Sequence, residues 1–102
     1  MRLYLIEATY TPDTWRHMME NPDAFDGEWL RTTILRLGGE LDGMWWTASG
    51  GDVVVICRLP SDICLAGLIA AFKANGTIVT ANVKILLSVD DQLAALRMAR
   101  GE

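Results

Sequence analysis

Turn and helix-capping residues divide the first half of this chain into segments of alternating type. Arg2 to Tyr10 is rich in Leu, Ile and aromatic residues, a composition that predicts a strand. Thr11-Pro12-Asp13 then supplies an N-cap, a first-turn proline and an acid at the positive end of a helix. Asn21-Pro22 breaks that helix, because proline disfavours helical geometry at the preceding residue. After the Asp23–Gly27 segment, helical spacing resumes and ends at two glycines, with apolar positions Trp29, Leu30, Ile34 and Leu37 before Gly38-Gly39.

The second half of the chain is divided in the same way. We expect a strand over Glu40–Ser49, a tight turn at Gly50-Gly51 and a second strand over Asp52–Leu59, which together form a hairpin. Ser61 can cap a helix from Ile63 to about Ala74, which stops at Asn75-Gly76. A β-branched strand over Thr77–Leu87 follows. Ser88 then caps a last helix, whose apolar residues include Leu93, Leu96 and Met98.

The resulting order is β-α-β-β-α-β with a C-terminal helix. This is the ferredoxin-like arrangement, an α+β fold with one four-stranded antiparallel sheet. Right-handed crossovers place both main helices on the same face of the sheet. With 102 residues and no linker, residues 1–102 are expected to form a single domain.

Composition excludes several classes of protein. The net charge is −4, and the nine basic side chains are scattered, which argues against nucleic-acid binding. No apolar run reaches the roughly 18 residues of a membrane helix, and no signal-peptide pattern follows the N-terminus, so we expect a cytoplasmic protein without a membrane partner. Cys57 and Cys64 match neither a disulfide scaffold nor a metal spacing and are interpreted as small buried hydrophobes.

One face of the predicted sheet has no helix to cover it. Alternation along the strands assigns to this open face the aliphatic residues Leu5, Val54, Ile56 and Ile78. The same rows carry polar residues, namely Glu7, Arg58, Thr80, Asn82 and Lys84. Because monomers rarely expose large apolar patches, we expect the aliphatic residues to form the interface of a homodimer, or of a higher oligomer.

Motifs spread over nearly the whole chain resemble the GYD-domain family of small bacterial proteins. They are Tyr10-Thr11-Pro12, Leu37-Gly38-Gly39, Trp46-Thr47, Gly50-Gly51-Asp52 with Val53-Val54-Val55, Leu59-Pro60 and Leu86-Leu87-Ser88. The resemblance implies a ferredoxin-like fold of the dimeric α+β barrel kind and brings no established activity. The Gly-Tyr-Asp motif of the family appears here as Gly50-Gly51-Asp52 and lacks its aromatic residue. Trp45 and Trp46, close in sequence, could compensate for it.

Few residues suggest chemistry. Glu7 is a candidate general base, because burial in mid-strand would raise the pKa of its carboxyl; pairing with Lys84 or Arg58 is its structural alternative. Asp52 is a second catalytic candidate, which could instead bind backbone N–H groups of the turn. The single histidine, His17, is interpreted as a surface or interface residue. No nucleophile, phosphate-loop or metal motif is present, so we expect neither a metal nor a cofactor.

Three functions therefore stay open. The first is a dimeric module that binds a small, partly apolar molecule on the open face, with Trp45, Trp46, Arg58, Thr80, Asn82 and Lys84 as candidate ligand contacts. The second is a cofactor-free enzyme, of monooxygenase or isomerase type, that uses the same cavity with Glu7 and Asp52. The third is a structural dimer without a ligand. A cavity of about 300 Å³ or more would weaken the third interpretation.

Overall fold

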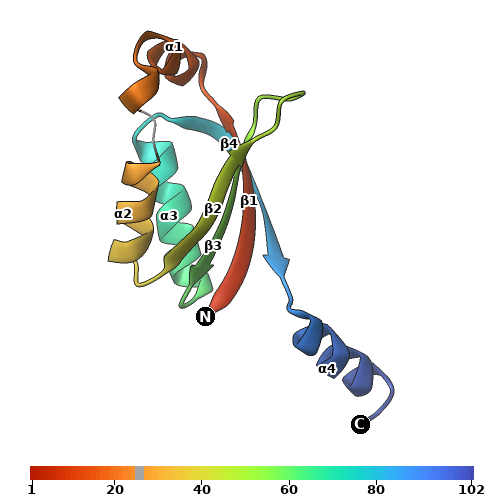
Figure 1. The fold of residues 1–102 in the computed structure, drawn as a ribbon. Coiled ribbons are helices and arrows are strands. Elements are labelled where there is room, and N and C mark those ends of the chain that lie inside the picture. The colour runs from red at the N-terminus through yellow and green to blue at the C-terminus, as the bar shows by residue number, and fades with distance from the viewer. Residues whose placement is uncertain (25–26) are drawn as a thin grey trace.

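The computed structural model describes residues 1–24 and 27–102. The chain forms β1 (Arg2–Tyr10), α1 (Pro12–Glu20), a 3-10 turn η1 (Pro22–Ala24), α2 (Glu28–Arg36), β2 (Glu40–Trp46), β3 (Val53–Leu59), α3 (Asp62–Ala74), β4 (Ile78–Leu86) and α4 (Val89–Ala99). Every predicted strand and helix is present (Figure 1). The expected break at Asp23–Gly27 includes residues 25 and 26, which lie outside the described residues.

The four strands form one antiparallel sheet in the order β2-β3-β1-β4. Helices α2 and α3 lie on one face of this sheet, and α1 lies at one end of that helix layer (Figure 1). No helix formed by the described residues covers the other face, which is called the open face below. The ferredoxin-like α+β fold is thus confirmed, with both main helices on one side as predicted.

Side-chain caps fix the starts of three helices. The Thr11 hydroxyl accepts a hydrogen bond from the Thr14 N–H at 3.2 Å at the start of α1. Ser61 accepts one at 3.4 Å from the residue three positions on and caps α3. Ser88 caps α4 in the same way, accepting from the Asp91 N–H at 3.1 Å. Each cap satisfies a backbone donor that the first helical turn leaves without a partner, so these boundaries agree with the sequence.

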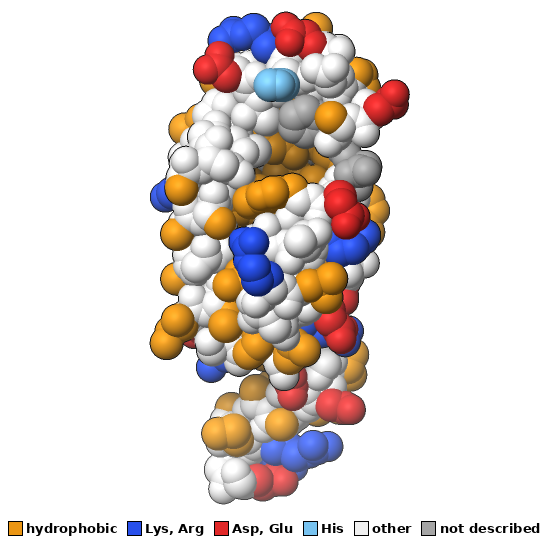
Figure 2. Space-filling view, turned by 90° about the vertical axis from the view of Figure 1, so that its left-hand side faces the viewer, with side chains coloured by type: hydrophobic (Ala, Val, Ile, Leu, Met, Phe, Trp, Pro, Cys, Tyr) orange, Lys and Arg blue, Asp and Glu red, His pale blue; other side chains and the backbone are white. Residues whose placement is uncertain are grey.

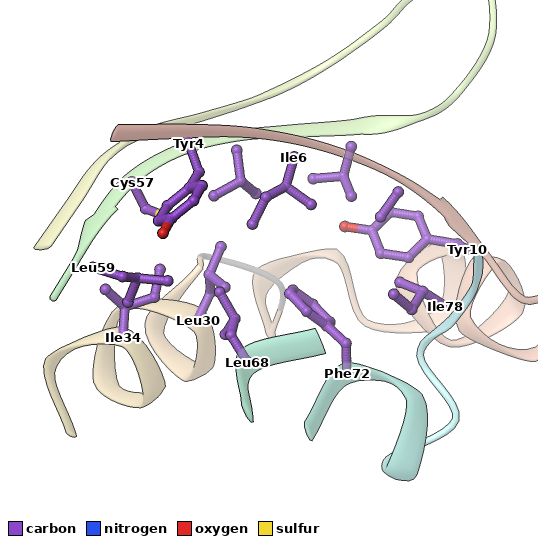
Figure 3. Packing of buried hydrophobic residues seen from close by; sticks show 13 residues of the cluster. Tyr4, Ile6, Tyr10, Leu30, Ile34, Cys57, Leu59, Leu68, Phe72 and Ile78 are labelled. Atoms are coloured by element: carbon purple, nitrogen blue, oxygen red, sulfur yellow. The ribbon is translucent and has the colours of Figure 1, made fainter. Parts of the chain in front are cut away.

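The hydrophobic core lies between the sheet and the two covering helices (Figure 3). Its fully buried side chains come from both layers, with Tyr4 and Ile6 from β1, Leu59 from β3, Ile34 from α2 and Leu68 from α3. Burial of each such side chain contributes about 1.5–3 kcal/mol, so this layer contact is the main source of stability. Of the two cysteines, Cys57 is buried in the core and Cys64 is partly buried against it; both are free thiols.

The hairpin between β2 and β3 is wider than predicted. Strand β2 ends at Trp46, so residues 47–52 form a loop instead of the expected two-residue turn at Gly50-Gly51. Thr47 closes this loop: its N–H donates to the Asp52 carbonyl at 2.8 Å, and its hydroxyl accepts from the Asp52 N–H at 3.0 Å. The Thr47 hydroxyl offers the backbone a local partner, which favours the longer loop.

The placement of Ile78 on the open face is wrong. A β-bulge interrupts the pairing of β1 and β4, so that Thr9 pairs with Thr80 but Tyr10 pairs with Ile78. Val79 is the extra residue. The side chains of β4 therefore change face at this point, because a bulge shifts the alternation by one residue. Ile78 is 5% exposed and packs in the core, whereas Val79 is 56% exposed.

Helix α4 projects past the end of β4 and away from the rest of the chain (Figure 1). None of its residues is buried. In the described residues, no helix is both long enough and apolar enough to cross a bilayer.

Candidate functional site: an aromatic pocket on the helix side

A pocket of about 170 Å³ opens on the helix-covered side of the sheet. Figure 2, which views that side, shows a hollow whose floor is hydrophobic. Four aromatic rings and a thioether dominate its lining, which consists of Tyr10, Ala24, Gly27, Glu28, Trp29, Leu30, Met44, Trp46, Phe72, Asn75 and Thr77. Two wider and more polar hollows, of about 320 and 330 Å³, lack this aromatic enclosure.

The aromatic walls come from the ends of four different elements. Tyr10 ends β1 and Trp46 ends β2, and both side chains point to the helix side of the sheet. Trp29 stands in the first turn of α2, and Phe72 in the last turns of α3. Figure 3 shows Tyr10 and Phe72 at the same end of the core, facing each other from sheet and helix. The pocket therefore forms where the sheet and its two covering helices end together.

Ring contacts hold these walls in place. Trp29 packs edge-to-face on Phe72 with ring centroids 5.1 Å apart. Tyr10 packs in the same way on Trp15 of α1, at 5.4 Å and an interplanar angle of 89°. Edge-to-face pairs of this kind contribute about 0.5–1.5 kcal/mol beyond their buried area. The pocket is thus bounded by mutually supported rings and is largely pre-formed.

Polar groups are few and lie at defined points of the pocket. The Tyr10 side chain is 6% exposed, and burial raises the pKa of its hydroxyl, with a smaller opposing effect from a hydrogen bond to Trp46. The phenol therefore stays protonated at neutral pH. Since the indole N–H of Trp46 can only donate, the Tyr10 oxygen accepts that bond and its O–H can donate elsewhere. The Asn75 carbonyl oxygen accepts from the Thr77 N–H at 2.9 Å, which leaves the Asn75 amide as a second donor.

The two adjacent tryptophans of β2 serve different faces. Trp46 pairs with Val53 and points into the pocket on the helix side. Trp45 pairs with Val54, lies on the open face and is 53% exposed. Its ring covers Gly43, where a Cβ would stand 2.2 Å from the indole. Of the six predicted ligand contacts, only Trp46 therefore belongs to the pocket.

The remaining predicted site residues lie on the open face. In the β1–β4 register, Thr9, Glu7 and Leu5 pair with Thr80, Asn82 and Lys84 respectively. The predicted interface residues Val54 and Ile56 lie beside this row on β3 and, like Leu5, are half-buried. The sheet thus brings the predicted open-face residues together, with Ile78 as the exception.

Arg58 and Asp52 have partners other than those predicted. Arg58 pairs with Asp42, the bulged residue of β2, at 3.3 Å. The Asp52 carboxylate accepts a hydrogen bond from the Thr9 hydroxyl at 3.0 Å. Among the described residues, no ion pair joins Glu7 to Lys84 or to Arg58. Neither candidate carboxylate, Glu7 nor Asp52, lines the aromatic pocket.

Sequence reasoning missed most of the pocket. From the sequence, Trp29 is named only as an apolar position with helical spacing, and neither Phe72 nor Met44 is singled out as a site residue. The available signal was positional: aromatic residues stand within a turn of the ends of β1, β2, α2 and α3. Where the ends of several strands and helices come together, regular packing leaves a gap. Aromatic residues at such ends therefore indicate a pocket.

Comparison with solved structures supports the fold. Rv0793 from Mycobacterium tuberculosis superposes with a TM-score of 0.53 at 18% identity, over 86% of this chain and 94% of that chain. An uncharacterized NIPSNAP-like domain protein from Burkholderia xenovorans gives 0.51 at 19% identity, over 86% and 84%. A second NIPSNAP domain protein of that organism gives 0.51 at 14%, over 87% and 95%. At these identities the likeness establishes the fold alone.

No curated protein matches the chain. The GYD domain matches it from residue 4 to residue 96, which is most of its length. The resemblance carried by the sequence motifs is thereby confirmed, and this chain belongs to the GYD domain family.

Proposed function

We propose that this protein binds a small, flat, mostly apolar molecule in the aromatic pocket, with one hydrogen-bond acceptor of the ligand directed at the Tyr10 hydroxyl. The observation that carries the proposal is the enclosure of the buried Tyr10 phenol by rings from three other elements. Pockets that bind small molecules have this composition: apolar walls and a few placed polar groups.

The size of the pocket limits the ligand. At about 170 Å³ it is smaller than the 300–1,000 Å³ typical of drug-sized ligands. An apolar cavity of about 150 Å³ holds a molecule the size of benzene. A single ring with a short substituent therefore matches this volume better than a fused two-ring system does.

Charge further narrows the class of ligand. Among the described residues that line the pocket, Glu28 is acidic and none is a lysine or an arginine. The whole chain carries a net charge of −4. An anionic ligand would meet repulsion without a compensating cation, so a neutral acceptor such as a carbonyl group is favoured.

The same proposal includes a dimer formed through the open face. Leu5, Val54 and Ile56 remain only half-buried in the single chain, and the Trp45 ring lies beside them over Gly43. Tryptophan is enriched in the residues that dominate interface energies. A second copy would bury this surface and leave the aromatic pocket, on the opposite side of the sheet, accessible in each subunit.

Nuclear magnetic resonance of the four tryptophan indole N–H groups tests the ligand proposal. Acetophenone, 4-hydroxyacetophenone and benzamide are neutral one-ring carbonyl compounds and serve as probes. We expect saturable shifts of the Trp29 and Trp46 signals and none at Trp45, which lies on the other face. 2-Acetylnaphthalene should bind far more weakly, because its second ring exceeds the pocket.

The Tyr10→Phe variant isolates the polar contact. A net hydrogen bond contributes about 0.5–1.5 kcal/mol, so the affinity for acetophenone should fall about two- to tenfold. Tyr4→Phe is the matched control, since Tyr4 is buried in the core away from the pocket. Absence of saturable shifts for all three probes, or shifts confined to Trp45, would refute the pocket as the binding site.

A further inference from the structure

We infer that α4 is an exchanged arm: in the dimer proposed above, the apolar stripe of each α4 packs on the open sheet face of the other copy. The stripe consists of Val89, Leu93 and Leu96. The inference rests on the proposed dimer and adds to it the element that covers the open face.

The first observation is that the apolar stripe of α4 is exposed and that none of the residues of this helix is buried. Val89, Leu93 and Leu96 are 77%, 42% and 56% exposed. Their spacing of four and three residues places them on one side of the helix. The Cα radius of gyration is 15.7 Å, against about 13 Å for a compact chain of this length. The arm thus enlarges the molecule without burying any of its own residues.

The second observation is that α4 is ordered by its sequence but too short to be stable unsupported. Ser88 caps it, and Asp90 and Asp91 stand at the positive end of its dipole. Helices shorter than about 12–15 residues are marginal in water and depend on packing of an apolar face. With 11 residues, α4 needs a surface to pack on.

The third observation is a match of charges between α4 and the open face. Along the helix, the acids Asp90 and Asp91 come first and the bases Arg97 and Arg100 last. Along the sheet, Glu7 and Asp52 lie toward one end and Lys84 toward the other, where Arg58 is already paired with Asp42. At 1.5 Å per residue, α4 is about 16 Å long. Asp52 and Arg58 are six residues apart along the strand, a distance of roughly 20 Å, so the helix and this part of the sheet have similar lengths.

Because α4 points away from its own sheet, we expect the α4 of a second copy to cover the open face. Ser88 has extended geometry, with φ −68° and ψ 167°, and the helix runs beyond the end of its own sheet. It therefore reaches another molecule more directly than its own open face. Under a two-fold axis the exchange is reciprocal, so that both stripes and both faces are covered at once.

Oligomeric state tests the inference on the full chain. Light scattering and sedimentation should show a dimer for wild type and a large loss of dimer for the Leu93→Glu/Leu96→Glu variant. Full burial of the two leucines predicts a dissociation constant raised about a hundredfold or more. Met98→Glu is the matched control: it places the same charge on the opposite side of α4, at a residue that is 74% exposed, and should leave the dimer intact.

Cross-linking between chains tests the placement. In a Cys64→Ser background, Leu93→Cys chains are mixed with size-tagged Asn82→Cys chains and treated with a bis-maleimide. We expect a cross-linked heterodimer, and much less of it when Met98→Cys replaces Leu93→Cys. Cross-links formed only within a chain carrying both cysteines would show α4 folded on its own sheet, which overturns the inference.

The experiments separate the failure of the arm from the failure of the dimer. A wild-type monomer would refute both the proposed dimer and the exchange. A dimer that Ile56→Arg disrupts but Leu93→Glu/Leu96→Glu does not would preserve the dimer and refute the role of α4. Circular dichroism and thermal unfolding of each variant would establish that the fold persists, as expected for changes outside the core.

Discussion

Substitution of Gly39 by alanine tests how closely the end of α2 approaches β3. Gly39 is buried, and its N–H donates to the Ile34 carbonyl at 2.9 Å. A Cβ at this position would stand 2.2 Å from the Arg58 carbonyl oxygen and 2.7 Å from the Leu59 Cδ2. Comfortable C···O contacts are about 3.3 Å, so the backbone of β3 would have to move by about 1 Å. The glycine is required here for close approach.

The expected cost of this substitution follows from the atoms involved. Overpacking costs about 1–3 kcal/mol when side chains can adjust, and here the obstacle is backbone of a central strand. We therefore expect Gly39→Ala to lower the free energy of unfolding by about 3 kcal/mol. For a chain of this length, that lowers Tm by about 12–24 °C. Such a loss is a large fraction of the 5–15 kcal/mol typical of a domain.

Urea denaturation and calorimetry of two glycine variants provide the assay. Gly67→Ala is the matched control: Gly67 lies within α3, and a Cβ there would meet only Leu37 Cδ2, at an ordinary 3.7 Å. Alanine in a helix interior is favoured over glycine by about 0.5–1 kcal/mol, so this variant should unfold a few degrees higher than wild type. The same change, glycine to alanine, is thus expected to lower the free energy of unfolding at position 39 and to raise it at position 67. Gly39→Ala within 0.5 kcal/mol of wild type would refute the close approach.

Two further predictions concern the core and the caps. Burial is the main cause that raises the pKa of Cys57 to about 11 from 9.0 and of Tyr4 to about 12 from 10.0, the latter also through its hydrogen bond to Asp62. Both groups release protons more readily in the unfolded chain, so their contribution to stability is fully present below pH 9 and should fall as pH rises from 9 to 12. In urea titrations, Cys57→Ala should remove part of the loss of stability between pH 9 and 11. A stability that does not change with pH over this range would contradict the prediction. Ser61→Ala removes the cap of α3 and should cost about 1 kcal/mol in the same assay, whereas an unchanged midpoint would show that the cap is dispensable.

The order of elements could be predicted because its signals are local. Thr11, Ser61 and Ser88 each cap the helix that follows them, and this depends only on residues within one turn. The bulge that turns Ile78 into the core depends instead on how β4 pairs with β1, which is distant in sequence. The wide loop closed by Thr47 was likewise missed, because a glycine pair indicates a turn without fixing its length.

The site was harder to predict than the fold for a related reason. Alternation correctly gathered Glu7, Asn82 and Lys84 on one face, since pairing in mid-strand preserves it. The aromatic pocket, however, has no sequence period, because Tyr10, Trp46 and Phe72 meet only when separate elements end at the same place. In the sequence, each of these aromatic residues has the spacing of a core residue. Only the tertiary structure shows which of them line a pocket and which fill the core.

The turn at Gly50-Gly51-Asp52, where the aromatic residue of the family motif is missing, connects the fold to the candidate site. Of the two tryptophans that could compensate for the missing aromatic, Trp45 lies over Gly43 and Trp46 lines the pocket. A Cβ on Gly51 would stand 3.1 Å from Cζ2 of Trp15, so α1 supplies the ring beside this turn. Glycine at position 51 leaves room for the Trp15 ring because it has no side chain. It also adopts φ +71°, which other residues rarely adopt. Since Trp15 also packs edge-to-face on Tyr10, the motif turn is joined through one ring to the wall that holds the proposed ligand donor.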